Sequence, residues 1–309
     1  MKIAIMGSGG LGSYYGTLLA LSGNEVSFIA RGDHLRAIQA NGLIIKGPDN
    51  TVVLKNAYAT DTPSNIGSVD VVLFCVKLYD IEDACKLLTP IINKKTLIIS
   101  VLNGINAPER IQKQLLEAKV FGGAARVSAK IEKPGIIKHL GTSDTSALIF
   151  GSDQFNNNSK AIEFCEKCNE AGFSTQITNN IEEILWDKMA HLCYVAGLTT
   201  LARIPIDEAM KVDELFKIGK LLLKEVQLVA NAKNISMNEN IVEDKIKIIS
   251  NFPKGLYASM YHDLIAGKKI ELEDIFGYIS KEGSLNNIPT PVCDFIYAFL
   301  KPYINGLVR

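Results

Sequence analysis

The sequence predicts an α/β N-terminal domain built on a doubly wound, mainly parallel sheet, followed by an all-helical C-terminal domain. Three observations predict this fold. Short β-branched runs alternate with helical patterns in the first half, which is typical of βαβ units. From about residue 181 onward the apolar spacing is helical throughout. The length of 309 residues favours two domains, which we place at residues 1–180 and 181–309.

The N-terminal strands are expected where apolar and β-branched residues run together without a break, because helices should cover both faces of the sheet. The predicted strands are Lys2–Met6, Glu25–Ala30, Val69–Val76, Thr96–Leu102, Val120–Val127 and Ser174–Thr178. The predicted helices are Leu11–Leu21, Asp33–Asn41, Asp80–Ile92, Pro108–Glu117 and Ala161–Ala171. Gly135–His139 and Ser146–Phe150 are expected to form a closing antiparallel pair.

The C-terminal domain is predicted to consist of helices. They are Ile181–Ala202, Asp207–Lys233, Glu239–Ser250, Leu256–Ala266, Leu272–Lys281 and Pro291–Ile304. Their helical spacing sets this half apart from the first.

Composition and charge exclude several classes of protein. Hydrophobic residues make up 47% of the chain and charged residues 21%, which argues against a disordered chain, a collagen or a coiled coil. The 33 basic and 33 acidic residues balance, so no broad basic field is present to hold a nucleic acid. Because the chain runs from Met1 straight into an apolar strand and no apolar run reaches the length of a membrane helix, we expect a cytoplasmic protein without a membrane partner.

The six cysteines are scattered along the chain, and we expect them to be reduced. Cys165 and Cys168 form a single CxxC pattern in a predicted helix, but no second Cys or His pair at zinc-ligand spacing lies nearby. We therefore expect no metal site.

A glycine-rich motif lies between the first predicted strand and the first predicted helix. Its residues are Gly7, Ser8, Gly9, Gly10, Leu11 and Gly12, in the order GxGxxG. The first glycine permits a tight turn, the second lets the backbone approach a pyrophosphate, and the third lets helix and strand pack closely. The helix N-terminus adds free N–H groups and a partial positive charge. The context predicts a Rossmann-type dinucleotide site, with a ligand-free glycine turn as the plain alternative.

The residue at the end of the second predicted strand indicates which dinucleotide binds. An acidic residue there would accept hydrogen bonds from the ribose 2′-OH of NAD, whereas this chain has Arg31. An arginine suits the 2′-phosphate of NADP(H), so we expect that cofactor. Asp33 offers an NAD-type alternative, and Lys77, after the third strand, is a candidate second cation.

Three later segments place polar side chains where a substrate site is expected. Asn103 follows a buried strand, Lys188 lies in Leu185-Trp186-Asp187-Lys188, and Glu271 begins a late helix. With the glycine motif, Arg31, Val76-Lys77, Ser259-Met260 and Ile288-Pro289-Thr290-Pro291, their order resembles that of the ketopantoate reductases (2-dehydropantoate 2-reductases) over essentially the whole chain. The fold implied by this resemblance is 6-phosphogluconate-dehydrogenase-like.

The resemblance implies NADPH-dependent reduction of 2-dehydropantoate to pantoate, a step of pantothenate and coenzyme A biosynthesis. Lys188 would be the general acid, and partial desolvation of a lysine can lower its pKa towards neutrality. Glu271 would accept a hydrogen bond from a substrate hydroxyl or orient the lysine. Ser259 and Asp263 would bind substrate, and Asn103 would form a hydrogen bond with the cofactor ribose or the substrate. For Ser259 and Asp263, helix capping or a surface pair are equally good interpretations.

The helix after Lys188 departs from the family pattern. The family commonly has Asn four and eight residues after its lysine, on the same helix face, whereas this chain has Leu192 and Ala196. The substrate therefore remains open between ketopantoate and a related, less polar 2-oxo acid. His191 is either a substitute donor or a packing residue.

Two rival functions remain at this point. One is another enzyme of the wider 6-phosphogluconate-dehydrogenase-like group, and the other is a non-catalytic NADP-binding regulator. Retention of both Lys188 and Glu271 speaks against the regulator, because a pure binder needs neither. We expect a small-molecule 2-oxo acid as the partner, no nucleic acid, and leave a homodimer open.

Overall fold

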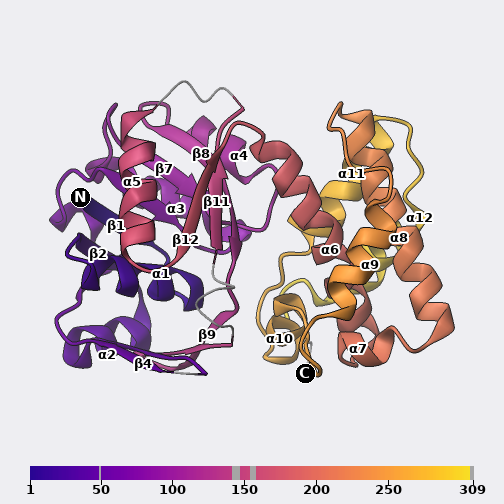
Figure 1. The fold of residues 1–309 in the computed structure, drawn as a ribbon, viewed down its shortest axis with the longest axis horizontal. Helices are drawn as coiled ribbons and strands as arrows, with labels where there is room; N and C mark the ends of the chain where they lie inside the picture. The colour runs from indigo at the N-terminus through magenta and orange to yellow at the C-terminus, as the bar shows by residue number, and fades with distance from the viewer. Residues whose placement is uncertain (49, 141–146, 154–157, 307–309) are drawn as a thin grey trace. The chain divides into compact units, whose positions relative to one another are not determined.

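A computed structural model describes residues 1–48, 50–140, 147–153 and 158–306 (Figure 1). The chain forms two compact units. The N-terminal unit comprises Met1–Leu102 and Asn106–Ile181, and the helical unit comprises Asn103–Ile105 and Glu182–Arg309. The predicted class, an α/β N-terminal region followed by a helical region, is confirmed.

An eight-stranded sheet forms the centre of the N-terminal unit, in the order β12-β11-β8-β7-β6-β1-β2-β5. Its strands are β1 (Lys2–Met6), β2 (Glu25–Ile29), β5 (Tyr58–Thr60), β6 (Val71–Phe74), β7 (Leu97–Ser100), β8 (Lys119–Arg126), β11 (Ala147–Gly151) and β12 (Ser174–Thr178). All neighbouring strands pair in parallel except β8 and β11, which are antiparallel. The predicted mainly parallel sheet is therefore confirmed.

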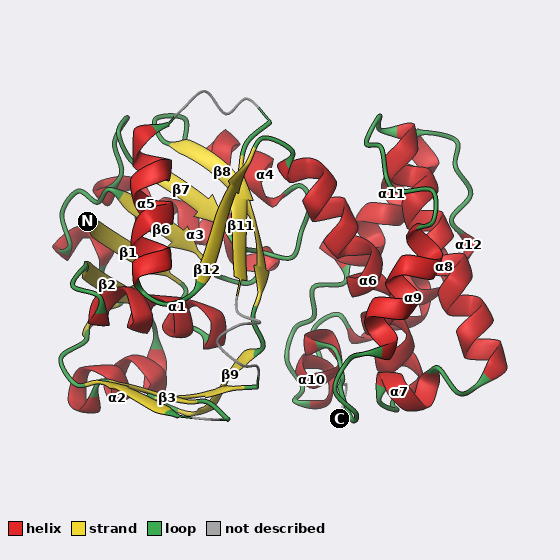
Figure 2. Cartoon of the chain, in the orientation of Figure 1, coloured by secondary structure: helices red, strands yellow, loops and turns green. Residues whose placement is uncertain are grey.

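Helices cover both faces of this sheet (Figure 2). They are α1 (Gly10–Leu21), α2 (Gly32–Asn41), α3 (Ile81–Leu88), α4 (Ala107–Gln114) and α5 (Ser159–Glu170), with short 3-10 segments at Pro63–Asn65, Leu78–Asp80 and Thr89–Ile91. Because side chains alternate along a strand, Ile3 and Ile5 enter the core under α1, α2 and α5, while Ala4 and Met6 enter the core under α3 and α4. This double burial explains the unbroken apolar runs of the central strands.

A second, four-stranded sheet has the order β4-β3-β10-β9 and packs against α1. Its strands are β3 (Leu43–Lys46), β4 (Thr51–Leu54), β9 (Ala129–Lys133) and β10 (Ile136–His139). The predicted antiparallel pairing of Gly135–His139 with Ser146–Phe150 is wrong: β10 pairs with β9 and β3, while β11 pairs with β8 and β12. Ser146 itself lies outside the described residues. A period-two pattern identifies a strand but not its partner.

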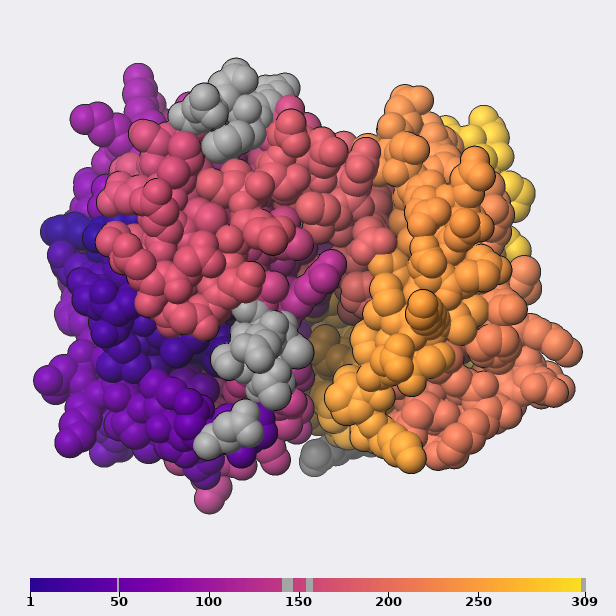
Figure 3. Space-filling view, viewed as in Figure 1, coloured from indigo at the N-terminus to yellow at the C-terminus, as the bar shows by residue number. Residues whose placement is uncertain are grey.

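The helical unit is built around one long helix, α6 (Ile181–Ala202). The other helices are α7 (Ile206–Ala209), α8 (Asp213–Ala232), α9 (Ile241–Ser250), α10 (Ser259–Ile265), α11 (Tyr278–Leu285) and α12 (Pro291–Leu300), with a π-helical turn at Glu273–Gly277 and a 3-10 turn at Lys301–Tyr303. The single helix predicted over 207–233 is thus divided into α7 and α8. Figure 3 shows the segment around α9, drawn in orange, on the near face of the helical unit.

A buried carboxylate connects two helices of this unit. Glu225 on α8 is only 6% exposed, and its two carboxylate oxygens accept hydrogen bonds from the backbone N–H groups of Val292 (2.8 Å) and Cys293 (2.9 Å). These are free donors at the first turn of α12, where a negative charge also meets the positive end of the helix dipole. Glu225 therefore supplies a cap that no residue of α12 provides.

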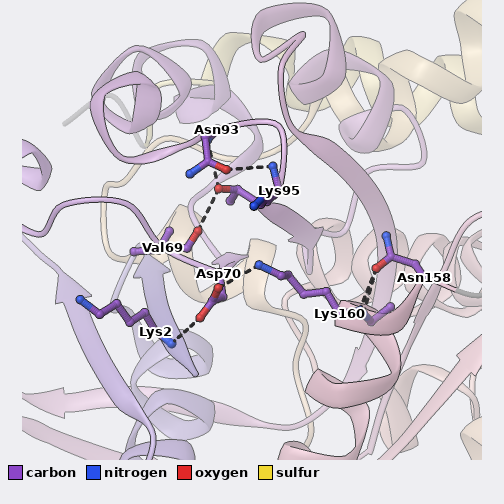
Figure 4. A network of polar contacts seen from close by, with 9 residues as sticks. Lys2, Val69, Asp70, Asn93, Lys95, Asn158 and Lys160 are labelled. Carbon is purple, nitrogen blue, oxygen red and sulfur yellow. Dashed lines mark hydrogen bonds and ion pairs between the residues drawn. The ribbon is translucent and has the colours of Figure 1, made fainter.

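A polar network anchors α5 to the main sheet at the start of β6 (Figure 4). The Asp70 carboxylate accepts hydrogen bonds from the Lys2 backbone N–H (2.9 Å) and the Lys160 ammonium (2.8 Å). Partial burial raises the pKa of Asp70, but the Lys160 hydrogen bond, the Lys2 N–H and the neighbouring positive charges outweigh it, and the net shift is downward. The carboxylate thus stabilises the fold in its ionised form.

Asp70→Asn is expected to lower the free energy of unfolding by about 1 kcal/mol at pH 7, the upper end for an ion pair this exposed to solvent. Because the folded-state pKa lies below the unfolded value of 3.8, this stabilisation is complete above that pH and is lost as pH falls through the folded pKa. Urea unfolding of both proteins at several pH values measures the difference. A gap between the two proteins that widens on acidification would contradict the assignment.

Candidate functional site

The strands of the main sheet bring three predicted cofactor residues to one edge. Met6 at the end of β1 is paired with Ile29 of β2 and Phe74 of β6, so the chain leaves all three strands at the same level. The glycine motif follows β1, Arg31 follows β2 and Lys77 follows β6. Ligands of open α/β sheets bind at this carboxyl edge.

The backbone of the glycine motif has the geometry that a dinucleotide loop requires. Gly7 has a φ of +93°, and a Cβ placed on it would lie 2.8 Å from the backbone nitrogen of Val76. A Cβ on Gly12 would lie 2.8 Å from Cγ2 of Ile5, so helix and strand are in close contact there. A Cβ on Gly9 would meet nothing within 4 Å. The first and third glycines are needed for the turn and the packing, and Gly9 leaves room for a ligand to approach.

The rest of the motif forms the entrance to α1. A Cβ on Gly10 would lie 2.7 Å from the carbonyl carbon of Ala129, and no side chain caps the helix at Gly9. Leu11 packs against the core beneath. The Ser8 hydroxyl is buried and has no hydrogen-bond partner within the described ranges. The first turn of α1 therefore presents backbone donors of the kind that bind phosphate.

Arg31 is the N-cap residue of α2, and its side chain is 86% exposed. Its guanidinium binds the Asp80 carboxylate at 3.0 Å, a contact that the sequence pattern does not reveal. An ion pair this exposed contributes little, so the guanidinium can exchange Asp80 for a phosphate at small cost. Asp33, the alternative NAD-type residue, binds Arg36 on the same helix. Lys77 is half-buried where the 3-10 turn after β6 begins.

In the helical unit, Lys188 lies on α6 and is half-buried, and its sequence neighbours Leu185, Trp186 and Met189 are buried. The residue before it, Asp187, forms an ion pair of 2.5 Å with Lys245 on α9. Lys245 is only 3% exposed, so the turn that carries Lys188 is anchored to a second helix. Sequence reasoning missed Lys245 because most lysines are solvent-exposed.

Ser259 and Asp263 lie one turn apart on α10, with Ser259 exposed and Asp263 half-buried. The start of α10 is connected to α6, because the Ala258 N–H donates to Oγ1 of Thr199 at 3.3 Å. Thr199 in turn donates to the Val195 carbonyl at 2.7 Å. The helix of Lys188 and the helix of Ser259 are therefore held together by a buried threonine that the sequence alone does not single out.

Glu271 is 6% exposed and lies two residues before the π-helical turn, a feature often found at functional sites. Glu273, two residues on, is exposed and binds Lys301 and the Tyr297 hydroxyl, which makes it a surface group. Asn103 follows β7 and is counted with the helical unit. The predicted residues thus fall into two groups, one in each unit.

At the two positions where the family commonly has Asn, the residues of this chain pack into an apolar core. Ala196 is 0% exposed, and Leu192 packs against the same core of the helical unit. His191 is half-buried and lies edge-on to Phe252, with ring centroids 6.4 Å apart. The helix face after Lys188 therefore offers packing groups at 192 and 196.

Within the described ranges, no three His, Cys, Asp or Glu side chains are arranged to hold a metal ion. Cys165 and Cys168 both lie on α5, and burial raises the pKa of each thiol. None of the described helices is long and apolar enough to cross a membrane.

Comparison with known proteins gives one consistent result. Residues 3–151 match the family described as ketopantoate reductase PanE/ApbA, and residues 180–304 match its C-terminal family. The 2-dehydropantoate 2-reductase of Pyrococcus horikoshii is 29% identical, with 97% of each chain covered.

Two solved structures show the same fold along the whole chain. The 2-dehydropantoate 2-reductase of Geobacter metallireducens has a TM-score of 0.91 at 26% identity, covering 98% of this chain and 99% of that one. D-mandelate dehydrogenase, solved with NADH and anilino(oxo)acetate, has a TM-score of 0.90 at 26% identity, covering 98% of this chain and 97% of that one.

Proposed function

Because this chain belongs to the ketopantoate reductase family, we propose that it reduces a small 2-oxo acid to the 2-hydroxy acid with NADPH, and that 2-dehydropantoate is the leading substrate. Members of this family are oxidoreductases acting on CH–OH groups. The observation that carries the proposal is that one chain holds both an open glycine loop at the sheet edge and a half-buried, anchored Lys188.

Each residue has a defined part in this reaction. NADPH, when bound, supplies hydride to the carbonyl carbon. The Lys188 ammonium donates a proton to the carbonyl oxygen, which becomes the hydroxyl of the product. Glu271 accepts a hydrogen bond from a substrate hydroxyl or orients Lys188. The Ser259 hydroxyl donates to the substrate carboxylate, and Asp263 and Asn103 complete the polar contacts.

The cofactor contacts are assigned in the same way. The motif Gly7 to Gly12 binds the pyrophosphate through backbone N–H groups, and Arg31 binds the 2′-phosphate after releasing Asp80. Lys77 adds a second cation at the same edge.

NADPH is expected to bind at least about tenfold more tightly than NADH, because one charge-assisted contact exceeds the roughly 1.4 kcal/mol that tenfold requires. Arg31→Ser should remove this preference. Arg36→Ser removes an exposed arginine of α2 that pairs with Asp33, and this matched control should keep the preference. Dissociation constants are measured by titrating cofactor fluorescence, and equal wild-type values or a preference for NADH would refute the assignment of Arg31.

A second candidate substrate is a less polar 2-oxo acid, favoured by the apolar groups at Leu192 and Ala196. The similarity to D-mandelate dehydrogenase supports the same view, since that enzyme was solved with an aryl-bearing oxo acid. A site lined by apolar groups discriminates weakly, by about 10–200-fold for a methylene-sized change.

Selectivity for 2-dehydropantoate over 2-oxoisovalerate is therefore expected to stay below roughly 10⁴ in kcat/KM, the size typical of a fully paired polar site. Leu192→Asn should raise it, and Leu192→Met, which conserves volume, should not. Leu192→Asn is the cleaner variant, because an amide at the fully buried Ala196 would also perturb the core. A wild-type preference above roughly 10⁴ would restore 2-dehydropantoate as the dedicated substrate.

A scan of 2-oxo acids for NADPH oxidation by the purified protein tests the whole proposal. Turnover of at least one of them is expected. Tight NADPH binding without turnover of any would favour the non-catalytic regulator instead.

A further inference from the structure

A chain of hydrogen bonds runs from the second sheet to the glycine motif and is not needed by any role assigned above. The backbone N–H of Gly135, in the turn between β9 and β10, donates to Nδ1 of His34 at 3.0 Å. The other ring nitrogen, Nε2, lies 3.4 Å from Oγ of Ser13. Ser13 Oγ in turn donates to the carbonyl oxygen of Ser8 at 2.9 Å. All four residues belong to the N-terminal unit.

The hydrogen bond from Gly135 determines which atom donates in each of the hydrogen bonds that follow. A backbone N–H can only donate, so Nδ1 of His34 must be an unprotonated acceptor and Nε2 must carry the ring proton. Nε2 therefore donates to Ser13 Oγ. A hydroxyl has a single proton, which Ser13 directs to the Ser8 carbonyl. Burial lowers the pKa of His34, partly opposed by hydrogen bonding to the Ser8 backbone, and so favours the neutral ring that this arrangement requires.

The last of these hydrogen bonds, from Ser13 Oγ to the Ser8 carbonyl, determines the orientation of one peptide group of the glycine motif. The Ser8–Gly9 peptide is trans, as are all the peptide bonds of the described residues, so its N–H points away from its carbonyl. With the Ser8 carbonyl held towards Ser13 on α1, the Gly9 N–H points to the opposite side. A Cβ on Gly9 would meet nothing within 4 Å, and no backbone carbonyl of the described residues accepts from the Gly9 N–H.

The other side of Ser8 is held independently of the histidine. Its N–H donates to the carbonyl of Ile29, the last residue of β2, at 3.0 Å. Rotation of the Ser8–Gly9 peptide is therefore the freedom that remains at this point of the loop. The Ser13 hydroxyl restricts this rotation by donating to the Ser8 carbonyl, and the His34 ring beside them supports it.

We propose that His34 is a positioning residue for the nucleotide site: through Ser13 it fixes the Ser8–Gly9 peptide so that the Gly9 N–H is presented to the cofactor pyrophosphate. This role rests on the proposed function, since it assumes that the motif binds a dinucleotide. It differs from the role of Arg31 on the same helix, because His34 acts on the pyrophosphate and Arg31 on the 2′-phosphate.

The two roles are separated by comparing NADPH with adenosine 2′-monophosphate, which carries the 2′-phosphate but no pyrophosphate. His34→Phe keeps an aromatic ring and removes both ring nitrogens. It should weaken NADPH binding about tenfold, as expected for loss of one hydrogen bond to a charged group. Binding of adenosine 2′-monophosphate, measured by competition, should change less than about twofold.

Two further variants show whether the hydrogen-bond chain is responsible. His34→Gln retains an acceptor and a donor on one side chain and should recover NADPH binding to within about threefold of wild type. Ser13→Ala removes the hydrogen bond to the Ser8 carbonyl and should weaken NADPH binding as much as His34→Phe does. The double variant should be no weaker than either single variant, because both changes break the same chain.

The outcomes are distinguishable. If the wild-type protein binds NADPH and His34→Phe binds it equally well, the role of His34 is refuted while the proposed function stands. The role of His34 is also refuted if His34→Phe weakens binding of NADPH and of adenosine 2′-monophosphate to the same extent, because that result would indicate displacement of α2. A wild-type protein that binds no dinucleotide would overturn the proposed function and the role of His34 with it.

Discussion

Lys188→Ala is expected to lower kcat by about 10²–10⁴ on the best 2-oxo acid while NADPH affinity stays nearly unchanged. Removing the ammonium leaves the carbonyl oxygen without a proton donor as hydride arrives. The residues assigned to the pyrophosphate and the 2′-phosphate lie in the other unit, so NADPH affinity should not depend on this side chain. Single-turnover NADPH oxidation and a cofactor titration measure the two quantities.

Lys188→Arg separates proton donation from charge. An arginine keeps the positive charge that favours substrate binding but does not give up its proton at any physiological pH. We therefore expect KM to be retained more fully than in Lys188→Ala, with kcat equally low. Lys217→Ala, at an exposed position on α8, is the control and should be indistinguishable from wild type. Near-normal turnover of Lys188→Ala would mean that another group is the acid.

Glu225→Ala is expected to lower the free energy of unfolding by about 2–4 kcal/mol, the largest effect on stability that we predict. The change removes two charge-assisted hydrogen bonds to the first turn of α12 and leaves a cavity beside Val292 and Cys293. Thermal unfolding should shift downward by about 3–6 °C for a protein of this size. Glu214→Ala, at an exposed site in the first turn of the same helix, should cost at most about 1 kcal/mol.

The titration of Glu225 gives a second readout. Burial raises the pKa of its carboxyl, while the N–H groups of Val292 and Cys293 lower it, and the net shift is upward. The folded protein therefore takes up a proton at Glu225 at a higher pH than the unfolded chain does, so the neutral side chain is tolerated in the fold. Glu225→Gln should accordingly cost less than Glu225→Ala. Equal losses in both variants would show that the ionised carboxylate, and not the volume of the side chain, is what this position requires.

Local sequence patterns determined several elements of the fold. Three elements have the bounds expected from the sequence: strands Lys2–Met6 and Ser174–Thr178 and helix Ile181–Ala202. Apolar runs, alternation and helical spacing act within one element and are written in consecutive residues. The sequence also predicted that Gly7, Arg31 and Lys77 lie at one edge of the sheet. Each of them follows a predicted strand, and the carboxyl ends of parallel strands lie at the same edge.

The partners of those elements were decided by the tertiary structure. The four-stranded sheet joins strands far apart in the chain, and β9 is almost entirely exposed, so its residues carry no apolar signature. The pairing of β10 with β3 and of β11 with β8 depends on distant segments whose contacts no local pattern encodes.

The same division holds for the site. The sequence by itself determined which chemical groups are present: the glycine motif, Arg31, Lys188 and Glu271. Only the tertiary structure decided what holds them, through the contacts of Arg31 with Asp80, Asp187 with Lys245, and His34 with Ser13. Side-chain type follows directly from the sequence, whereas a hydrogen bond or ion pair forms only where folding brings two distant groups within about 3 Å of each other.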